Sequence, residues 1–317
     1  MKNKTILVTG GAGFIGSHLC KKLLEDGYRV ISMDNLITGN MANVKRLKDN
    51  KNFLFIRHDI TKKFSEKIKK ELSDLAYILD LACPASPVDF PRYPLEIMEV
   101  CFNGTKNLLE LAREYKVPFL QTSTSEVYGD PEIHPQPESY WGHANPYGPR
   151  SCYDEGKRSA EALIYTYKNT YKVDTKIIRI FNTYGPQMRP DDGRVVSNFI
   201  VQAITGKNIT VYGDGKQTRS FCYVSDMVGG IIAMMKSREE GPFNIGNPGE
   251  FTILELAQKV IKLTGTKSKI IFKPLPKDDP KQRKPIITLA KKKLGWSPKV
   301  SLDEGLEKTL EFFKNNL

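Results

Sequence analysis

Three glycines at a fixed spacing follow the first apolar run of the chain. The run Thr5–Thr9 is five residues long. Gly10, Gly13 and Gly16 lead from it into a segment with helical patterning. Glycine allows a tight turn and lets backbone amides approach a pyrophosphate closely, while the N-terminus of the following helix supplies partial positive charge. The pattern predicts a dinucleotide site, and a turn that serves only helix packing is the alternative.

Acidic residues stand at the ends of the next two apolar runs. Asp34 lies eighteen residues beyond Gly16, where its carboxylate can accept hydrogen bonds from both hydroxyls of an adenosine ribose. That charge would repel a 2′-phosphate, and no arginine occurs in residues 35–40, so NAD is predicted rather than NADP. Asp59 ends the third run, where it can reach the adenine amino group or simply terminate a strand.

Short β-rich runs alternate with amphipathic segments through the first half of the chain. Parallel strands need helical crossovers, so the alternation predicts an α/β fold with a doubly wound parallel sheet of the Rossmann type. The predicted strands are Thr5–Thr9, Arg29–Met33, Phe53–Arg57, Tyr77–Leu81, Phe119–Ser123 and Lys176–Phe181, and the helices between them include 16–25, beginning near Ser17, 94–115 and 153–171.

The alternation stops after Phe181, where Gly- and Pro-rich loops begin. We expect residues 1–181 to form an NAD-binding domain and residues 182–317 a smaller C-terminal α/β domain that binds the substrate. A helix at Asp226–Met235 and a strand at Pro242–Gly246 indicate that residues 222–247 return to the first sheet. The chain is expected to end in a helix at Leu302–Lys314.

The composition excludes several classes of protein. Hydrophobic residues make up 40% and charged residues 26% of the chain, which is ordinary for a globular protein. No apolar run approaches about 18 residues, so no membrane partner is expected. The five cysteines are scattered without a Cys-x-x-Cys pair, which fits a reducing cytoplasm, and the four histidines never stand at i, i+4. No metal site is therefore expected.

A net charge of +12 raises the question of a nucleic-acid partner. The basic residues are mostly interspersed with acids, and the densest basic stretch lacks aromatic residues on which bases could stack. We therefore expect no nucleic acid. A small acidic substrate with phosphates would use the same charge.

A tyrosine and a lysine stand four residues apart at Tyr153 and Lys157, on one face of a predicted helix. A free tyrosine has a pKa of about 10, so a base near neutrality needs a shift of roughly three units, or about 4 kcal/mol. An adjacent ammonium group and the positive nicotinamide ring can supply that shift where water is excluded. The pair occurs often by chance, but its place beyond the fifth strand of a dinucleotide fold favours catalysis.

The fifth predicted strand ends in Thr122-Ser-Thr124-Ser125-Glu126. Polar side chains at the carboxyl end of a parallel strand face the crevice where ligands bind. Local capping and turn formation are the alternative role for the hydroxyl groups.

These motifs together resemble the extended short-chain dehydrogenase/reductase family that acts on nucleotide sugars. The similarity covers nearly the whole chain and is most specific in 134–158, 179–186 and 192–199. In those segments the chain is similar to the members that convert UDP-glucuronate to UDP-xylose. The resemblance implies a UDP-sugar substrate, decarboxylation through a 4-keto intermediate with internal recycling of NAD, and a homodimer formed through helices 94–115 and 153–171.

The resemblance also implies a role for each site residue. Tyr153 is the base at O4 of the sugar, Lys157 tunes it and holds the nicotinamide ribose, and Thr124 hydrogen-bonds O4. Ser125 and Glu126 contact the sugar near C5 and C6, and their division between positioning and proton transfer stays open. The implied cofactor-binding residues are Gly10, Gly13, Phe14, Ile15, Gly16, Asp34, Asn35, Asp59, Ile60, Leu81, Ala82, Tyr153 and Lys157. The implied substrate-binding residues are Asn182, Arg194, Asn198, Tyr212, Arg219 and Arg283, with the guanidinium forks of Arg219 and Arg283 suited to the diphosphate or, for Arg283, the sugar.

Position 125 separates the sister reactions. A nucleotide-sugar 4,6-dehydratase of this family carries Thr-Asp-Glu at this strand end, and the Asp protonates the departing 6-hydroxyl, whereas this chain has Ser125. Loss of carbon dioxide needs no such acid, because cleavage after oxidation at C4 leaves an enolate that polar donors stabilise. A UDP-sugar 4-epimerase or 4,6-dehydratase, a decarboxylase that releases the 4-keto pentose, and a non-catalytic NAD-binding protein remain alternatives.

Three positions depart from the pattern of the family. Ile286 stands where an acid is usual, Cys101 replaces an asparagine, and Asp80 replaces a histidine that often precedes the Leu-Ala pair. These departures bear on affinity and local geometry more than on the class of reaction.

Overall fold

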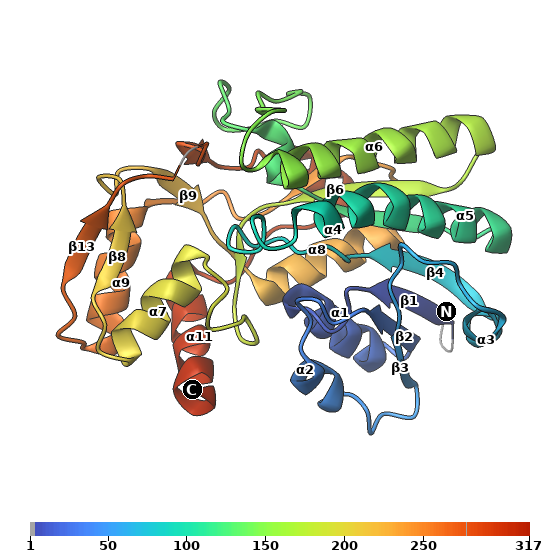
Figure 1. Ribbon diagram of the computed structural model, residues 1–317, viewed down its shortest axis with the longest axis horizontal. Helices are drawn as coiled ribbons and strands as arrows, with labels where there is room; N and C mark the ends of the chain where they lie inside the picture. Colours follow the sequence, from blue (N-terminus) through green and yellow to red (C-terminus); the bar gives the residue numbers. More distant parts are fainter. Residues whose placement is uncertain (1–3, 277) are drawn as a thin grey trace.

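The computed structural model describes residues 4–276 and 278–317 and has a seven-stranded parallel sheet at its centre (Figure 1). The strand order is β11-β6-β5-β4-β1-β2-β3, and every neighbouring pair is parallel. This order confirms the predicted doubly wound α/β fold. The strands are β1 Thr5–Thr9, β2 Arg29–Asp34, β3 Phe53–Arg57, β4 Leu75–Asp80, β5 Phe119–Thr124, β6 Thr175–Ile180 and β11 Phe243–Ile245.

Helices cover both faces of this sheet. Side chains alternate across a strand, so Ile6 and Val8 of β1 pack into one apolar cluster and Leu7 into another on the opposite face. The first cluster holds α1 and α8, and the second holds α5 and α6. The helices of this part are α1 Phe14–Glu25, α2 Met41–Lys45, α3 Glu66–Glu71, α4 Pro94–Glu99, α5 Thr105–Tyr115, α6 Ser151–Tyr171 and α8 Val224–Lys236.

A smaller group of strands and helices lies at one end of the sheet (Figure 1). β8 pairs with β13 in parallel, β9 lies between β12 and β14, and the first apolar cluster continues into α9 and α11. The remaining elements of the chain are β7 Thr183–Tyr184, α7 Val195–Ile204, β8 Ile209–Tyr212, β9 Thr218–Ser220, β10 Cys222–Tyr223, β12 Glu250–Thr252, α9 Ile253–Thr264, β13 Ile270–Lys273, β14 Gln282–Arg283, α10 Thr288–Leu294 and α11 Leu302–Asn316. The domain boundaries stay a prediction.

Two predicted helices differ from the observed ones by an interruption or by more than two residues at an end. The single helix expected over 94–115 is interrupted by a π-helical turn, η1 Val100–Gly104, between α4 and α5. Such turns are rare and local, and hydrophobic periodicity does not reveal them. The first helix begins at Phe14 rather than near Ser17, because Gly13 is its N-cap. None of the helices in the described ranges is long and apolar enough to cross a membrane.

The edge strand β11 is tied to two loops by the fully buried side chain of Asn244. Its amide donates to the carbonyls of Gln136 at 3.0 Å and Ile286 at 3.1 Å. Its side-chain oxygen accepts from the Tyr128 hydroxyl at 2.8 Å. Segments far apart in the sequence are therefore fixed to the same edge of the sheet.

Candidate active site

Two adjoining cavities lie at the carboxyl ends of the parallel strands. The larger has a volume of about 530 Å³ and the smaller about 310 Å³, and both are lined by Gly10, Gly13 and Leu81. Among the predicted site residues, all of which the structure describes, only Arg283 lines neither. The larger cavity is lined by Phe14, Ile15, Gly16, Thr124, Ser125, Glu126, Tyr153, Lys157, Asn182, Arg194, Asn198, Tyr212 and Arg219, and the smaller by Asp34, Asn35, Asp59, Ile60 and Ala82.

The glycine turn forms the floor where the two cavities meet. Gly10 has a φ of +68°, and a Cβ atom there would lie 2.6 Å from the carbonyl oxygen of Leu81, so only glycine fits. Gly13 caps α1 without any side chain, which leaves the amides of the first turn without a side-chain partner. This is the geometry of an anion site at a helix N-terminus, open to a pyrophosphate.

Asp34 lies at the end of β2 beside this turn and is buried. Its two carboxylate oxygens accept from the amides of Ala12 at 3.0 Å and Leu36 at 2.8 Å. Burial raises the pKa of Asp34, and the two amide donors oppose that shift. Asp59 accepts from Asn35 at 3.2 Å and from the Thr61 amide at 2.9 Å, so the acid also stabilises the turn after β3, which agrees with the alternative of a strand terminus.

Tyr153 and Lys157 project from the first turns of α6 and are both buried. Phe90 stacks on the Tyr153 ring with centroids 4.9 Å apart, and Lys157 Nζ donates to the Thr122 carbonyl at 3.2 Å. Burial raises the pKa of Tyr153, and the Lys157 charge opposes that shift without reversing it. Lys157 alone therefore does not make Tyr153 a base near neutral pH, so a further positive charge is needed.

Thr124, Ser125 and Glu126 follow one another where β5 passes into a short 3-10 turn, η2 Ser125–Tyr128. The Thr124 hydroxyl accepts from the Glu126 amide at 3.2 Å, so it caps the turn while it lines the cavity. Ser125 is buried and faces the same cavity. The sequence thus brings the three polar groups and Tyr153 to one wall.

Glu126 is held by two arginines. Arg150 Nη2 lies 2.5 Å from its Oε2, and Arg283 Nη2 lies 3.3 Å from the same atom. Burial alone would raise the pKa of Glu126, but the Arg283 and Arg150 charges outweigh it and lower the pKa to about 2. Glu126 is therefore ionised at neutral pH. Burial and the Glu126 charge raise the pKa of nearby Asp154 to about 7.

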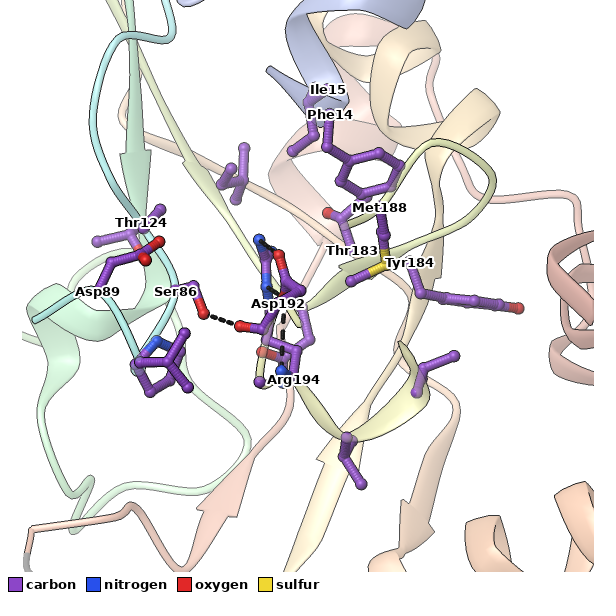
Figure 2. A pocket seen from close by; sticks show the side chains of 18 of the residues that line it. Phe14, Ile15, Ser86, Asp89, Thr124, Thr183, Tyr184, Met188, Asp192 and Arg194 are labelled. Atoms are coloured by element: carbon purple, nitrogen blue, oxygen red, sulfur yellow. Dashed lines mark hydrogen bonds and ion pairs between the residues drawn. The ribbon is translucent and has the colours of Figure 1, made fainter. Parts of the chain in front are cut away.

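The predicted phosphate-binding arginines are each paired with an acid. Arg194 binds Asp192 through two bonds of 2.6 and 3.0 Å, and Arg219 Nη2 lies 2.8 Å from Asp279. Figure 2 shows Asp192 and Arg194 on one wall of the cavity, with Phe14, Ile15 and Met188 gathered near the start of α1. A diphosphate would have to share these guanidinium groups with the acids or displace them.

Arg283 is 1% exposed and lines neither cavity. Besides Glu126, it donates to the carbonyls of Ser125 and Gly129. It therefore supports the wall of the cavity from behind in this structure, whereas the sequence led us to expect it over the diphosphate or the sugar.

The remaining predicted substrate residues take different positions. Asn198 donates to the Gly193 carbonyl at 2.9 Å, which fixes the loop before α7. Tyr212 is partly exposed at the end of β8, and Asn182 follows β6. All three line the larger cavity.

Several lining residues were not predicted. Arg150 precedes Tyr153 by three positions, so its place beside the predicted Tyr153–Lys157 pair could have been inferred from helical spacing. Arg189 binds Asp89 at 2.8 Å. Ser86 donates to the Asp192 carbonyl (Figure 2). Only the tertiary fold brings these residues together.

The three departures from the family pattern are all accommodated. Asp80 is buried, where it accepts from Thr9 Oγ1 at 2.6 Å and from the Ala82 amide at 3.1 Å. Ile286 uses only its backbone, with its amide donating to Gln136 at 2.9 Å. Cys101 lies on η1, with its Sγ 3.7 Å from that of Cys83. Within residues 4–276 and 278–317 no three His, Cys, Asp or Glu side chains are grouped to hold a metal ion.

The glycine turn, the acid at the end of β2 and the Tyr-x-x-x-Lys pair on α6 define a short-chain dehydrogenase/reductase of the extended type. The chain belongs to the GDP-mannose 4,6 dehydratase family, whose sequence model matches residues 7–309.

Relatives match the chain over its whole length. It is 52% identical over 316 residues to UDP-glucuronic acid decarboxylase 1 of Arabidopsis thaliana, covering 100% of this chain and 71% of that protein. It is 49% identical over 314 residues to UDP-glucuronic acid decarboxylase 1 of Danio rerio, covering 99% and 73%.

Solved structures of the same fold carry related activities. UDP-glucuronic acid 4-epimerase from Bacillus cereus, in complex with UDP-glucuronic acid and NAD, superposes with a TM-score of 0.89 at 32% identity, covering 98% of this chain and 99% of that one. dTDP-glucose 4,6-dehydratase from Bacillus anthracis, in complex with NAD, gives 0.87 at 28% identity and covers 99% and 97%.

Proposed function

We propose that this enzyme decarboxylates UDP-glucuronate to UDP-xylose with NAD as a recycled cofactor. The observation that carries the proposal is the shared cavity wall where Tyr153 and Lys157 meet Thr124, Ser125 and Glu126, with no acid at position 125. Relatives about half identical over the full chain are UDP-glucuronic acid decarboxylases, which supports the same assignment.

The residues of the smaller cavity and the glycine turn fit NAD. The groove contains three features in succession: Gly10, where no Cβ atom obstructs the ligand, the start of α1 without a side-chain cap, and the buried carboxylate of Asp34. We propose that the α1 amides hold the pyrophosphate and Asp34 the adenosine ribose. When bound, NAD would accept the hydride from C4, return it after decarboxylation, and carry a positive ring charge beside Tyr153.

Tyr153 would remove the O4 proton of the sugar and later return it. Its buried phenol needs two positive neighbours to become a base, and Lys157 is the one that the chain itself supplies. Thr124 lines the same wall and would orient O4 by a hydrogen bond. Lys157 keeps its position through the Thr122 carbonyl.

Glu126 would act by charge rather than by proton donation. With a pKa of about 2 it holds no proton near neutrality. A fixed negative charge near the substrate carboxylate favours the loss of that charge as carbon dioxide. Ser125 then remains as a small hydroxyl group beside C5 and C6, where it leaves room for the carboxylate and can donate to the enolate.

The UDP part would lie toward the other side of the larger cavity. Arg194 and Arg219 line it and are the cations that we assign to the diphosphate. Asn182, Asn198 and Tyr212 line the remaining part of the uridine-diphosphate pocket. Arg283 would keep Glu126 ionised from behind the wall.

A homodimer is part of the proposal. Leu95 on α4 is 72% exposed and Tyr165 on α6 is 70% exposed, and Met98 and Phe102 are exposed on the same stretch before α5. These helices present apolar surface that a second copy would cover. We propose a cytoplasmic location because the five cysteines of the chain are free.

A 4-epimerase is the second candidate, because an epimerase that holds UDP-glucuronic acid and NAD shares this fold. It would give UDP-galacturonate and no carbon dioxide. A decarboxylase that releases the 4-keto pentose would accumulate NADH.

A proton-NMR time course with UDP-glucuronate, with carbon dioxide and NADH followed in parallel, separates these outcomes. UDP-xylose with carbon dioxide and a steady NADH level supports the proposal. An epimerised acid, a 4-keto product with rising NADH, or no product above the enzyme-free rate would each contradict it.

A further inference from the structure

Two thiols meet beside the catalytic pair. Cys83 follows β4, and Cys101 lies on η1, with their sulfur atoms 3.7 Å apart. Cys83 is half-buried and lines both cavities, whereas Cys101 is buried behind it. A molecule that enters the cavities can therefore reach the first sulfur, and the first sulfur can reach the second.

The Lys157 ammonium group acts on both thiols. A hydrogen bond from the Cys83 thiol lowers the pKa of Cys101, and the Lys157 charge acts in the same direction against burial. Burial raises the pKa of Cys83. Either sulfur can donate the hydrogen bond between them, and the Lys157 charge favours the thiolate form of each.

We propose that Cys83 and Cys101 form an oxidation site at which a hydroperoxide converts the two thiols to a disulfide. The Cys83 sulfur attacks the peroxide O–O bond, which gives Cys83 sulfenic acid and one water from hydrogen peroxide. Cys101 then attacks the Cys83 sulfur, forming the S–S bond and releasing a second water. Two electrons pass from the sulfurs to the peroxide, and no other oxidant is required.

The new bond would disturb the catalytic helix. A disulfide needs sulfurs about 2.05 Å apart, so Cys101 and Cys83 must move together. Cys101 packs directly on Gly156 of α6, where a Cβ atom would lie only 3.2 Å from its Sγ. Gly156 precedes Lys157, and Tyr153 shares an apolar cluster with Cys101. A shift of η1 should therefore displace the side chains of both Tyr153 and Lys157.

Occupation of the cofactor groove should protect the pair. Cys83 lines both cavities together with Gly10, Gly13 and Leu81, the residues proposed to lie under the dinucleotide. This part of the inference rests on the proposed function, whereas the disulfide itself does not. Bound NAD would cover the part of the groove in which Cys83 lies and should slow the access of peroxide to its sulfur.

The test is peptide mapping after hydrogen peroxide treatment of the whole enzyme. Free thiols are blocked and the protein is digested with trypsin without reduction. Cleavage after Arg92 separates Cys83, in peptide 71–92, from Cys101, in peptide 93–106. We expect these peptides linked and two hydrogen atoms lighter than their sum. Turnover should fall at least about tenfold in step with the link, and dithiothreitol should restore both.

Two serine variants supply the controls. Cys101→Ser should form no link under the same peroxide dose, and Cys83 should stop at the sulfenic or sulfinic acid. Cys152→Ser removes another buried thiol of the same apolar cluster and should behave as the wild type. Circular dichroism establishes that each variant is folded.

Several outcomes would overturn the proposal. These are a wild type without the 71–92 to 93–106 link, a Cys83 sulfinic acid as the only product, or a link to Cys152 instead. A link that leaves turnover unchanged would reject the coupling to α6. Link formation that saturating NAD does not slow would reject the route through the groove. The mapping needs no substrate, so it stays decisive if UDP-glucuronate is not turned over.

Discussion

The guanidinium group of Arg283 lies 3.3 Å from the carboxylate of Glu126, although 157 positions separate the two residues in the chain. Arg283 belongs to β14 in the smaller group of strands, and Glu126 follows β5 of the central sheet. Their ion pair joins the two parts of the molecule directly behind the wall that carries Ser125 and Thr124. The same ion pair therefore keeps Glu126 ionised and connects the two parts of the molecule that form the cavity.

Removal of the Arg283 charge should destabilise the protein in a pH-dependent way. The pKa of Glu126 is about 2 in the folded protein, while a glutamate in an unfolded chain titrates at about 4.3. The pair therefore stabilises the fold above about pH 4.3, and this contribution is lost as the pH falls toward 2. Arg283→Met should lower the free energy of unfolding by about 2 kcal/mol at neutral pH, because the buried carboxylate of Glu126 keeps Arg150 but loses its second cationic partner.

Urea unfolding of both proteins between about pH 3 and 7 measures this effect. The difference between wild type and Arg283→Met should narrow at the acid end. Arg283→Lys keeps the positive charge but loses the planar guanidinium group, so it should lower the free energy of unfolding less than Arg283→Met does. A difference that stayed constant with pH would show that Arg283 contributes packing alone.

Tyr153→Phe should retain the fold and bind NAD, but lose nearly all turnover of UDP-glucuronate. The change deletes only the hydroxyl that we propose takes the O4 proton, while the stacking on Phe90 is preserved. Steady-state rates and a fluorescence titration with NADH measure the two properties. A variant that kept more than about a tenth of the wild-type rate, a loss below about 1.4 kcal/mol, would remove Tyr153 from the role of base.

Asp34→Ala should weaken NAD binding and reduce its preference over NADP. The carboxylate is proposed to accept from the ribose hydroxyls and to repel a 2′-phosphate. Asp34→Asn is the matched control, because it keeps an oxygen acceptor for the Ala12 or Leu36 amide without the charge. Calorimetric affinities for both cofactors decide the matter, and unchanged values in both variants would place the ribose elsewhere.

Ser125→Asp should weaken binding of UDP-glucuronate while leaving UDP-glucose less affected. Two unit charges about 4 Å apart at an effective dielectric near 20 repel by about 4 kcal/mol, which corresponds to hundreds-fold in rate or affinity. Ser125→Asn is the matched control, because asparagine is nearly the same size as aspartate but carries no charge. Affinities for both sugars at two salt concentrations separate charge from steric effects.

Equal losses for both sugars in the Asp and Asn variants would indicate crowding of this buried position. No loss in either variant would place Ser125 away from C6. In that case the decarboxylase assignment would rest on the relatives alone.

The sequence was most informative where local chemistry and fold require the same residue. Gly10 is needed by the turn, and Tyr153 and Lys157 are spaced by the helix, so both features could be predicted and both line the cavity. The π-helical turn at 100–104 could not be predicted, because hydrophobic periodicity does not detect one unusual turn. The pairing of Arg194 with Asp192 could not be predicted either, because residue spacing does not determine which acid an arginine contacts. The position of Arg283 behind the cavity wall, rather than over the ligand, also depends on a tertiary contact that the sequence does not reveal.

The position of Asn244 has a mechanical consequence. Its buried side chain is bonded to Tyr128, Gln136 and Ile286, so the edge of the sheet and the two loops behave as a single rigid frame. A hinge rotation that swung one half of the molecule over the other at this edge would break three buried hydrogen bonds at once, at a cost of about 1–3 kcal/mol for each group left unpaired. The enzyme should therefore fit itself to its ligand through side chains that exchange partners, such as Arg194 and Arg219, while its frame stays still.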